Sequence, residues 1–356
     1  MTTLAHYQTI LDAAGEPYRV LPLQMDGAVL ITRRGGRILG LFPAPDAPNL
    51  LWTSSAFDSV EAFRAFTTRT DGWHWNLGGD RIWIAPEITY NVRDRRDFGG
   101  TWAIPPAMDP GEYALAGDDH STALTAEVRL TGCEHGAVIG ETHVRVTRMI
   151  YPVPPPVYAD ASVVCLGYEQ QVTLGRRGSQ PQPFSEVWNL VQLNAGGTLI
   201  IPVIGAVEAS DYVAPVPDFA RQVTNGALHL PLNGRQQFKI GYQSPCMTGR
   251  MGYLQQLPDG RAALLVRNFF NDPANLYAEE PPDQPGKTGH SVHVYNDGGA
   301  VDQGRPFCEM ECSGRTLGTF NGFTRSAAHD TFSLWAYVGA PDAIREIARN
   351  LLGSAV

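Results

Sequence analysis

The chain of 356 residues carries a formal net charge of −9, with 43% hydrophobic and 18% charged residues. This composition is typical of a globular protein with enough apolar material for a core. Basic residues form no run anywhere in the chain, so we do not expect nucleic acid or an anionic membrane as a partner.

The N-terminal region lacks the basic start and apolar run of a secretion signal. The longest apolar stretches, such as "TLIIPVIGAV" at 198–207, reach about half of the length that a membrane span requires. Five cysteines, an odd number without paired spacing, are typical of reduced thiols. We therefore expect a cytoplasmic protein, while its oligomeric state stays open.

Short or alternating apolar runs, bounded by Gly, Pro, Asn or Asp, recur along the whole chain and predict strands. The clearest of them lie at 28–42, 123–132, 142–153, 162–175, 197–205, 237–242, 262–270, 290–297 and 332–339. The 37 glycines and 27 prolines are scattered between these runs, as turn residues are in a protein with many strands.

Helical periodicity is rare. Residues 58–69 open with Asp58 and carry Glu61 three positions later, which predicts a capped helix. Residues 341–352 place Ile344, Ile347 and Leu351 on one face and predict a closing helix near 342–352. Many strands with few helices and no long repeat indicate an all-β protein, with two large antiparallel sheets packed face to face. We expect one domain over 1–356.

Two carboxylates share one face of a predicted strand at "FCEMEC", residues 307–312. Alternation puts Glu309 and Glu311 on one side of the strand and Cys308, Met310 and Cys312 on the other, core-facing side. The two acids lie about 7 Å apart along the strand. Like charges at that distance raise each other's pKa, which suits acid–base chemistry. The alternative is that both acids simply face water.

Aromatic and charged residues also gather in "NLGGDRIWIAPE", residues 76–87. Alternation puts Arg81 and Trp83 on one face of the predicted strand, and Trp73 and Trp75 lie just upstream. An indole beside a guanidinium suits a sugar ring, because the C–H face packs on the ring and arginine bonds hydroxyls. The alternative is that these large aromatic side chains belong to the core.

The same stretch adds Asp80 and Glu87 as further acids. A separate stretch, "RNFFND" at 267–272, begins with Arg267, whose side chain is of a type that binds hydroxyl groups.

His290 and His293 are three positions apart on a predicted strand and should point to opposite faces, so they cannot chelate one metal unless a bulge intervenes. Either of them alone could donate a proton.

The motifs of serine hydrolysis, phosphate binding and metal chelation are missing. We therefore expect neither a metal nor a cofactor.

Several words of the sequence, in chain order, resemble the galactose-mutarotase-like (aldose 1-epimerase-like) proteins, and a bacterial branch of them in particular: "GGRILGLF", "NLLW", "GGDRIWIAPE", "EVWNLVQLNAGGTLIIPV" and "FCEMECSG". The likeness covers residues 25 to 340 and implies a β-supersandwich fold. By this resemblance Arg81 matches the substrate-binding arginine, and Glu309 or Glu311 stands where the family has its general base. The family's word "HTYFNL", which supplies the general acid histidine, is absent.

These observations predict a carbohydrate-active enzyme that acts at the anomeric carbon of a mono- or oligosaccharide. Glycoside hydrolysis comes first because carboxylates abound while the mutarotase acid is missing. An aldose 1-epimerase is the alternative, followed by a polysaccharide lyase or a non-catalytic sugar-binding protein. The expected catalytic residues are Glu309, Glu311 and Glu87. The expected sugar-binding residues are Arg81, Trp83, Asp80, Trp73, Trp75, Arg267 and His293.

Overall fold

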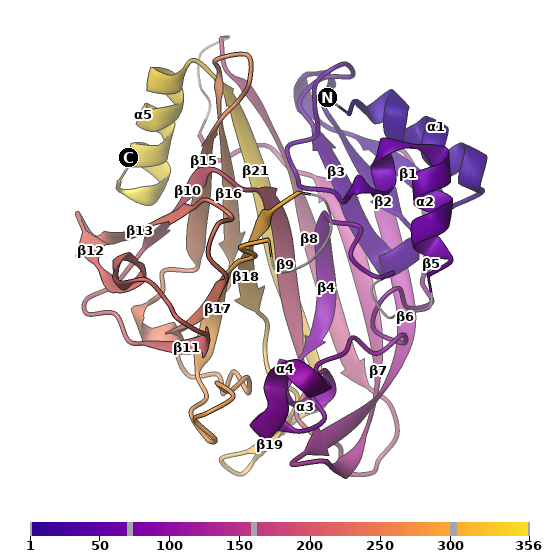
Figure 1. Ribbon diagram of the computed structural model, residues 1–356, viewed down its shortest axis with the longest axis vertical. Coiled ribbons are helices and arrows are strands. Elements are labelled where there is room, and N and C mark those ends of the chain that lie inside the picture. The colour runs from indigo at the N-terminus through magenta and orange to yellow at the C-terminus, as the bar shows by residue number, and fades with distance from the viewer. Residues whose placement is uncertain (1, 70–73, 158–161, 300–304, 355–356) are drawn as a thin grey trace.

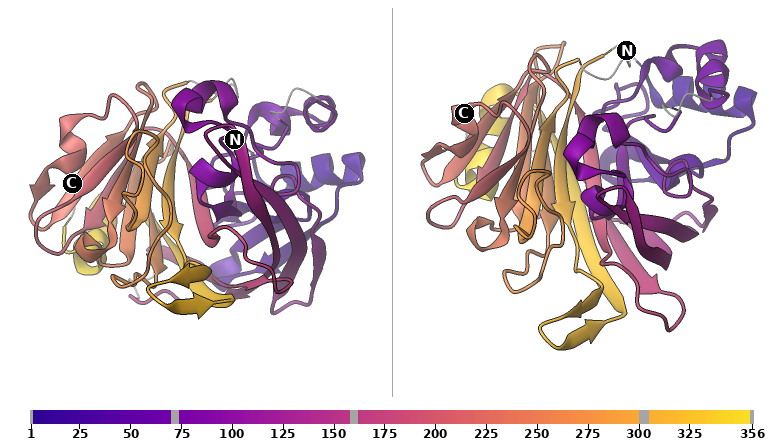
Figure 2. Two further views of the ribbon diagram at one scale, coloured as in Figure 1. Left: turned by 90° about the horizontal axis from the view of Figure 1, so that it is seen from below. Right: turned by 60° about the horizontal axis from the view of Figure 1, so that its bottom comes forward.

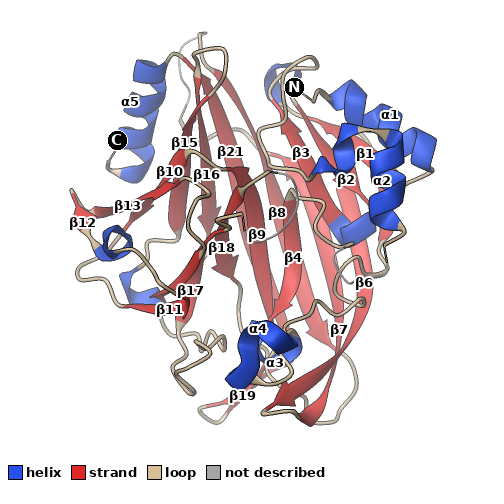
Figure 3. Ribbon diagram, in the orientation of Figure 1, coloured by secondary structure: helices blue, strands red, loops and turns tan. Residues whose placement is uncertain are grey.

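A computed structural model describes residues 2–69, 74–157, 162–299 and 305–354. Two large sheets dominate it, and neighbouring strands within both sheets run antiparallel (Figure 1). Helices lie mainly at the periphery (Figure 3). The predicted all-β fold class with large antiparallel sheets is confirmed.

The smaller of the two large sheets has nine strands, which come from positions between residues 18 and 313 of the chain. In spatial order its strands are β1 (Tyr18–Pro22), β2 (Ala28–Thr32), β3 (Arg37–Phe42), β4 (Asp80–Ala85), β9 (Glu186–Asn194), β18 (Phe307–Ser313), β17 (His290–Asn296), β14 (Phe238–Gln243) and β11 (Ala209–Val213).

The larger sheet has ten strands. In spatial order they are β12 (Val223–Thr224), β13 (Ala227–Leu232), β10 (Gly197–Pro202), β15 (Arg250–Gln256), β16 (Ala262–Phe269), β21 (Ala327–Gly339), β8 (Val164–Arg176), β7 (Ala137–Pro152), β6 (Thr122–Glu134) and β5 (Ala114–Gly117). A separate two-stranded hairpin joins β19 (Gly318–Phe320) to β20 (Phe323–Arg325).

The described helices are short. The α-helices are α1 (Leu4–Ala14), α2 (Val60–Thr67), α3 (Glu87–Tyr90), α4 (Phe98–Thr101) and α5 (Pro341–Leu352). The 3₁₀ turns are η1 (Gln24–Asp26), η2 (Arg34–Gly36), η3 (Ser55–Asp58), η4 (Arg95–Asp97), η5 (Asp218–Arg221) and η6 (Ser244–Cys246). Among the described residues, none of these helices is long and apolar enough to cross a membrane.

The helices confirm one sequence prediction and correct two. Helix α5 spans Pro341–Leu352 as predicted and lies on the opposite side of the molecule from α1 and α2 (Figures 1 and 2). Helix α2 begins one position later than predicted, because the Ser59 hydroxyl, and not Asp58, accepts the amide of Ala62 as its cap. Helix α1 was not predicted.

The main core lies between the two sheets, where each strand turns its apolar residues inward. On β18, Cys308, Met310 and Cys312 are at most 1% exposed and belong to this core, which confirms the predicted alternation. All five cysteines lie outside any disulfide bond, also as predicted.

The structure corrects the placement of Asp80 and Arg267. Asp80 is the neighbour of Arg81 on β4, so alternation turns it toward the opposite sheet and away from the face that carries Arg81. Its carboxylate pairs there with Arg267 of β16 and lies 3.6 Å from Arg148 of β7, and it accepts the Tyr168 hydroxyl at 2.6 Å. Burial by itself would raise the pKa of Asp80, but the two arginines hold it below its ordinary value. This cluster joins the two sheets.

We predict that Asp80→Ala destabilises the fold by about 3–5 kcal/mol, because it leaves buried arginines without their counter-charge. Urea unfolding of the purified protein measures this cost. The matched control is Asp342→Ala, which removes an aspartate 99% exposed at its side chain and should leave the midpoint nearly unchanged. Equal midpoints for both variants would contradict a structural role for the cluster.

Candidate functional site

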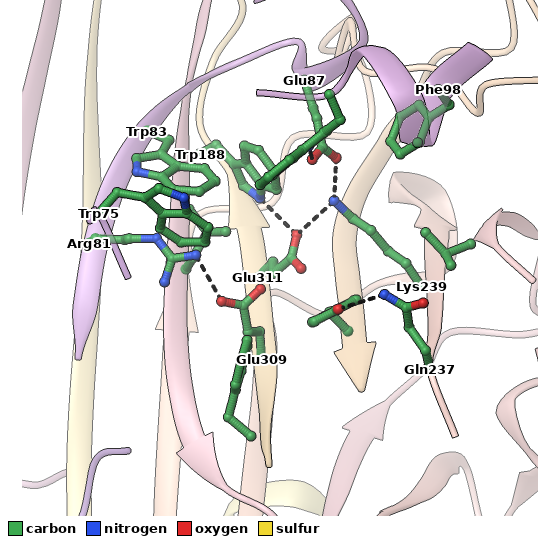
Figure 4. A pocket seen from close by; sticks show the side chains of 16 residues that line it. Trp75, Arg81, Trp83, Glu87, Phe98, Trp188, Gln237, Lys239, Glu309 and Glu311 are labelled. Carbon is green, nitrogen blue, oxygen red and sulfur yellow. Dashed lines mark hydrogen bonds and ion pairs between the residues drawn. The ribbon is translucent and has the colours of Figure 1, made fainter. Parts of the chain in front are cut away.

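A cavity of about 270 Å³ opens on the face of the nine-stranded sheet that points away from the main core. Strands β4, β9, β18, β17 and β14 form its floor, and the segment around α3 and α4 contributes one wall (Figure 4). Its aromatic lining includes Trp75, Trp83, Trp102, Trp188, Tyr295 and Phe98. Its charged lining consists of Arg81, Lys239, Glu87, Glu309 and Glu311.

Strand register brings these side chains together from distant parts of the sequence. On neighbouring strands, Leu190 of β9 pairs with Arg81 on one side and with Glu311 on the other. Tyr295 of β17 likewise stands between Glu309 and Lys239. Cross-strand partners point to the same face of a sheet, so all of these residues face the cavity.

The predicted site residues divide into four groups. Six of them line the cavity: Trp75, Arg81, Trp83, Glu87, Glu309 and Glu311. Asp80 and Arg267 lie between the sheets, as described above, and His293 is buried beside the cavity without lining it. Trp73 lies outside the described residues.

Arg81 and Glu309 form an ion pair at the cavity floor, with 2.8 Å between Nη2 and Oε1. The guanidinium also lies 4.3 Å from the centre of the Trp83 ring and 5.6 Å from that of Trp75. Its Nε and Nη1 atoms are buried without a hydrogen-bond partner. Arg81 therefore retains N–H donors that a bound hydroxyl group could satisfy.

Glu311 occupies a different environment, although it lies only two residues away. Its Oε2 accepts the Trp188 indole N–H at 2.8 Å and lies 3.5 Å from Nζ of Lys239, while Oε1 has no partner. Burial raises the pKa of Glu311 to about 8; Lys239 opposes this rise, and Glu309 adds to it. Burial therefore favours the protonated form of Glu311.

Lys239 joins the wall of the cavity to its floor. Its Nζ lies 2.7 Å from Oε2 of Glu87 and 4.3 Å from the centre of the Trp188 ring (Figure 4). Burial alone would lower the pKa of Lys239, but Glu311 and Glu87 together raise it above the ordinary value. Lys239 therefore remains an ammonium cation.

Hydrogen bonds hold both the side chain and the backbone amide of Glu87. Its Oε1 accepts the Trp102 indole N–H at 2.8 Å. The carboxylate of Glu279 accepts the backbone amides of Glu87 and Ile88, which are the first two of α3. Burial and the charge of Glu87 raise the pKa of Glu279 well above its usual range.

A second buried ion pair supports the aromatic wall from behind. The carboxylate of Asp109 accepts the Trp83 indole N–H at 2.9 Å and pairs with Arg37. Arg37 also donates to the carbonyl oxygens of Trp75 at 2.6 Å and Gly78 at 2.8 Å. One ion pair thus holds the Trp83 indole and the backbone of Trp75, whose two rings flank Arg81.

The histidines depart from the sequence prediction. A bulge between Tyr242 and Gln243 shifts the register of β14 against β17. Both His290 and His293 therefore pack against the Tyr212 ring, with 5.6 and 4.8 Å between the ring centres. Burial lowers the pKa of His293 well below its ordinary value, and both of its ring nitrogens lack a partner. His293 is therefore a neutral imidazole next to Glu311 in register.

Sequence reasoning missed several residues of the site. Lys239 lies in the predicted strand 237–242, where alternation separates it from Ile240, but a lone lysine in a strand carries no signal of its own. Trp188 lies in "EVWNLVQLNAGGTLIIPV", a word that carried the resemblance but indicated no role for this residue, and Trp102 lies in no recognisable motif. In the described part of the chain, no group of three His, Cys, Asp or Glu residues could hold a metal ion.

Comparison with known proteins finds no matching family model and no matching curated protein. Among solved structures, the chain is similar to the crystal structure of a proposed aldose 1-epimerase from Klebsiella pneumoniae subsp. pneumoniae MGH 78578. The likeness covers 91% of this chain and 80% of that one, with 10% sequence identity and a TM-score of 0.42.

Proposed function

We propose that this protein is a carbohydrate-active enzyme that binds one sugar ring and interconverts its anomers, as an aldose 1-epimerase does. This reverses the order of the two reactions favoured by the sequence, in which glycoside hydrolysis came first. The proposal rests on the arrangement of acid and base in the cavity.

The observation that carries the proposal is that two glutamates facing one cavity have unequal environments. Glu309 is the carboxylate partner of Arg81, whereas Glu311 is buried and holds a proton at neutral pH. Environments that separate two carboxyl groups in this way give one base and one acid. In the family that the sequence resembles, the general acid is a histidine, and the word that carries it is absent here. Glu311 takes the place of that general acid in our proposal.

The proton balance of the reaction closes within this pair. Glu309 takes the proton of the anomeric hydroxyl, the bond between C1 and the ring oxygen breaks, and Glu311 gives its proton to the ring oxygen. The resulting open-chain aldehyde rotates about the bond between C1 and C2. Closure then runs in reverse: the chain hydroxyl that had been the ring oxygen attacks C1 and gives its proton back to Glu311, and Glu309 returns its proton to the aldehyde oxygen, which becomes the new anomeric hydroxyl.

The rest of the cavity suits a single pyranose. Indole rings offer flat surfaces to C–H faces, and the unpartnered Nε and Nη1 of Arg81 can donate to hydroxyl oxygens. A cavity of about 270 Å³ is slightly smaller than the usual small-molecule site of about 300–1,000 Å³, which suits a ligand of one ring.

Glycoside hydrolysis is the second candidate, because alternate residues of a strand lie about 7 Å apart, within the spacing of inverting glycosidases. We rank it second since Glu309 and Glu311 are at most 5% exposed. A glycosidic leaving group needs room beyond its acid, whereas a free anomeric hydroxyl needs none.

Proton NMR at the anomeric position separates these functions in one assay. For an epimerase, freshly dissolved α-aldoses should reach anomeric equilibrium faster with the protein than without it, and a panel of oligosaccharides should stay intact. New reducing ends would indicate a hydrolase, and new vinyl signals a lyase. Line broadening without turnover would indicate a binding protein.

We predict that Glu309→Gln and Glu311→Gln each lower kcat by about 10²–10⁴, since each removes a proton carrier. Trp83→Ala removes a stacking surface and should chiefly raise KM. Anomer-exchange rates over a range of sugar concentrations measure both constants. If both glutamine variants keep wild-type turnover, the proposed acid and base are wrong.

The pH dependence follows from the acid. Because the pKa of Glu311 in the folded protein is raised to about 8, the acid is present below that pH and is lost as pH rises through it. We predict that kcat/KM falls about tenfold per pH unit above about 8. Lys239 lowers the pKa of Glu311, so in Lys239→Met the fall of kcat/KM should begin at a higher pH. A flat profile from pH 7 to 10 would contradict Glu311 as the acid.

A further inference from the structure

The cations of the cavity are already neutralised by protein carboxylates. Lys239 and Arg81 are the only Lys or Arg residues that line it among the described residues, and the undescribed segments contain neither residue type. Each of the two pairs with a glutamate at 2.7 or 2.8 Å. A third glutamate, Glu311, faces the same space.

The pair that involves Lys239 is unusual because its carboxylate comes from outside the sheet. Glu87 lies at the start of α3 and not on a floor strand. The Trp102 indole holds its side chain, and Glu279 holds its backbone amide. With its side chain and backbone both fixed, Glu87 outcompetes a free carboxylate for the ammonium group, since a bound ligand must be immobilised first.

A substrate carboxylate would therefore enter a cavity without an available counter-charge. Beside Lys239 it would face the carboxylate of Glu87, and beside Arg81 it would face that of Glu309. Like charges brought together in a buried site oppose binding strongly. The unpartnered donors of Arg81 can still serve hydroxyl oxygens, which add no charge.

We propose that Glu87 is a specificity-determining residue: by neutralising Lys239 it makes the site accept uncharged sugars and reject sugar carboxylates such as uronates. This inference rests on the proposed function only in taking the ligand to be a sugar. Glu87 acts through charge and takes no part in the proton transfers of Glu309 and Glu311.

The first test compares three ligands of one shape with the wild-type protein: D-galactose, D-galacturonate and D-galacturonamide, with the D-glucose series in parallel. The amide matches the uronate in size but carries no charge. Calorimetric titration at pH 7 should show hexose and uronamide binding, and uronate binding at least about tenfold more weakly than uronamide. Uronate binding as tight as that of the amide would overturn the proposal.

The second test frees the ammonium group. Glu87→Gln keeps the size of the side chain and an acceptor for Trp102, and it should strengthen uronate binding relative to uronamide by at least about tenfold. Adding Lys239→Gln in the same protein should abolish this gain. Glu346→Gln, which makes the same charge change at an exposed position of α5, should leave the ratio unchanged.

The outcomes separate the two proposals. A protein that binds none of these sugars would contradict the proposed function. If the folded Glu87→Gln variant binds sugars but its affinity for uronate relative to uronamide is the same as in the wild type, only the role of Glu87 would be overturned. If that variant fails to fold, the comparison of uronate with uronamide in the wild-type protein still decides.

Discussion

The buried carboxylate of Asp80 is the interaction on which the rest of the site depends. It joins β4 of the nine-stranded sheet to Arg267 and Arg148 of the other sheet, and so fixes how β4 sits in the molecule. Because side chains alternate along a strand, fixing Asp80 inward forces Arg81 outward into the cavity. A shift of one residue would exchange the two and place an aspartate where the cavity needs a guanidinium.

Electrostatics within the cavity follow from an excess of acids in a buried space. Lys239 cannot balance Glu87, Glu311 and Glu279 at once, so burial keeps protons on some of them. The raised pKa of Glu311 and the ion pair of Glu309 with Arg81 together make the two glutamates chemically different. Acid–base chemistry and preference for an uncharged ligand thus have one common cause in our proposals.

The aromatic wall depends equally on buried polar groups. Trp83 and Trp188 direct their indole N–H groups to Asp109 and Glu311, and Trp102 directs its own to Glu87. A buried indole that donates in this way has a fixed orientation, and its faces stay available for packing. These carboxyl groups therefore orient indole rings that line the cavity.

The local pattern of the sequence was enough to predict the strands, the closing helix and the two faces of β18, because alternation is a property of a single strand. It also directed attention to Arg81, Trp83 and the two glutamates. It could not show that Asp80 and Arg267 meet between the sheets, since their pairing joins residues 187 positions apart. Nor could it show that Lys239 reaches Glu87, or that a bulge turns His290 and His293 to one side. Only the tertiary structure decided these points, because pKa shifts and ion pairs depend on burial and on neighbours that strand register brings together.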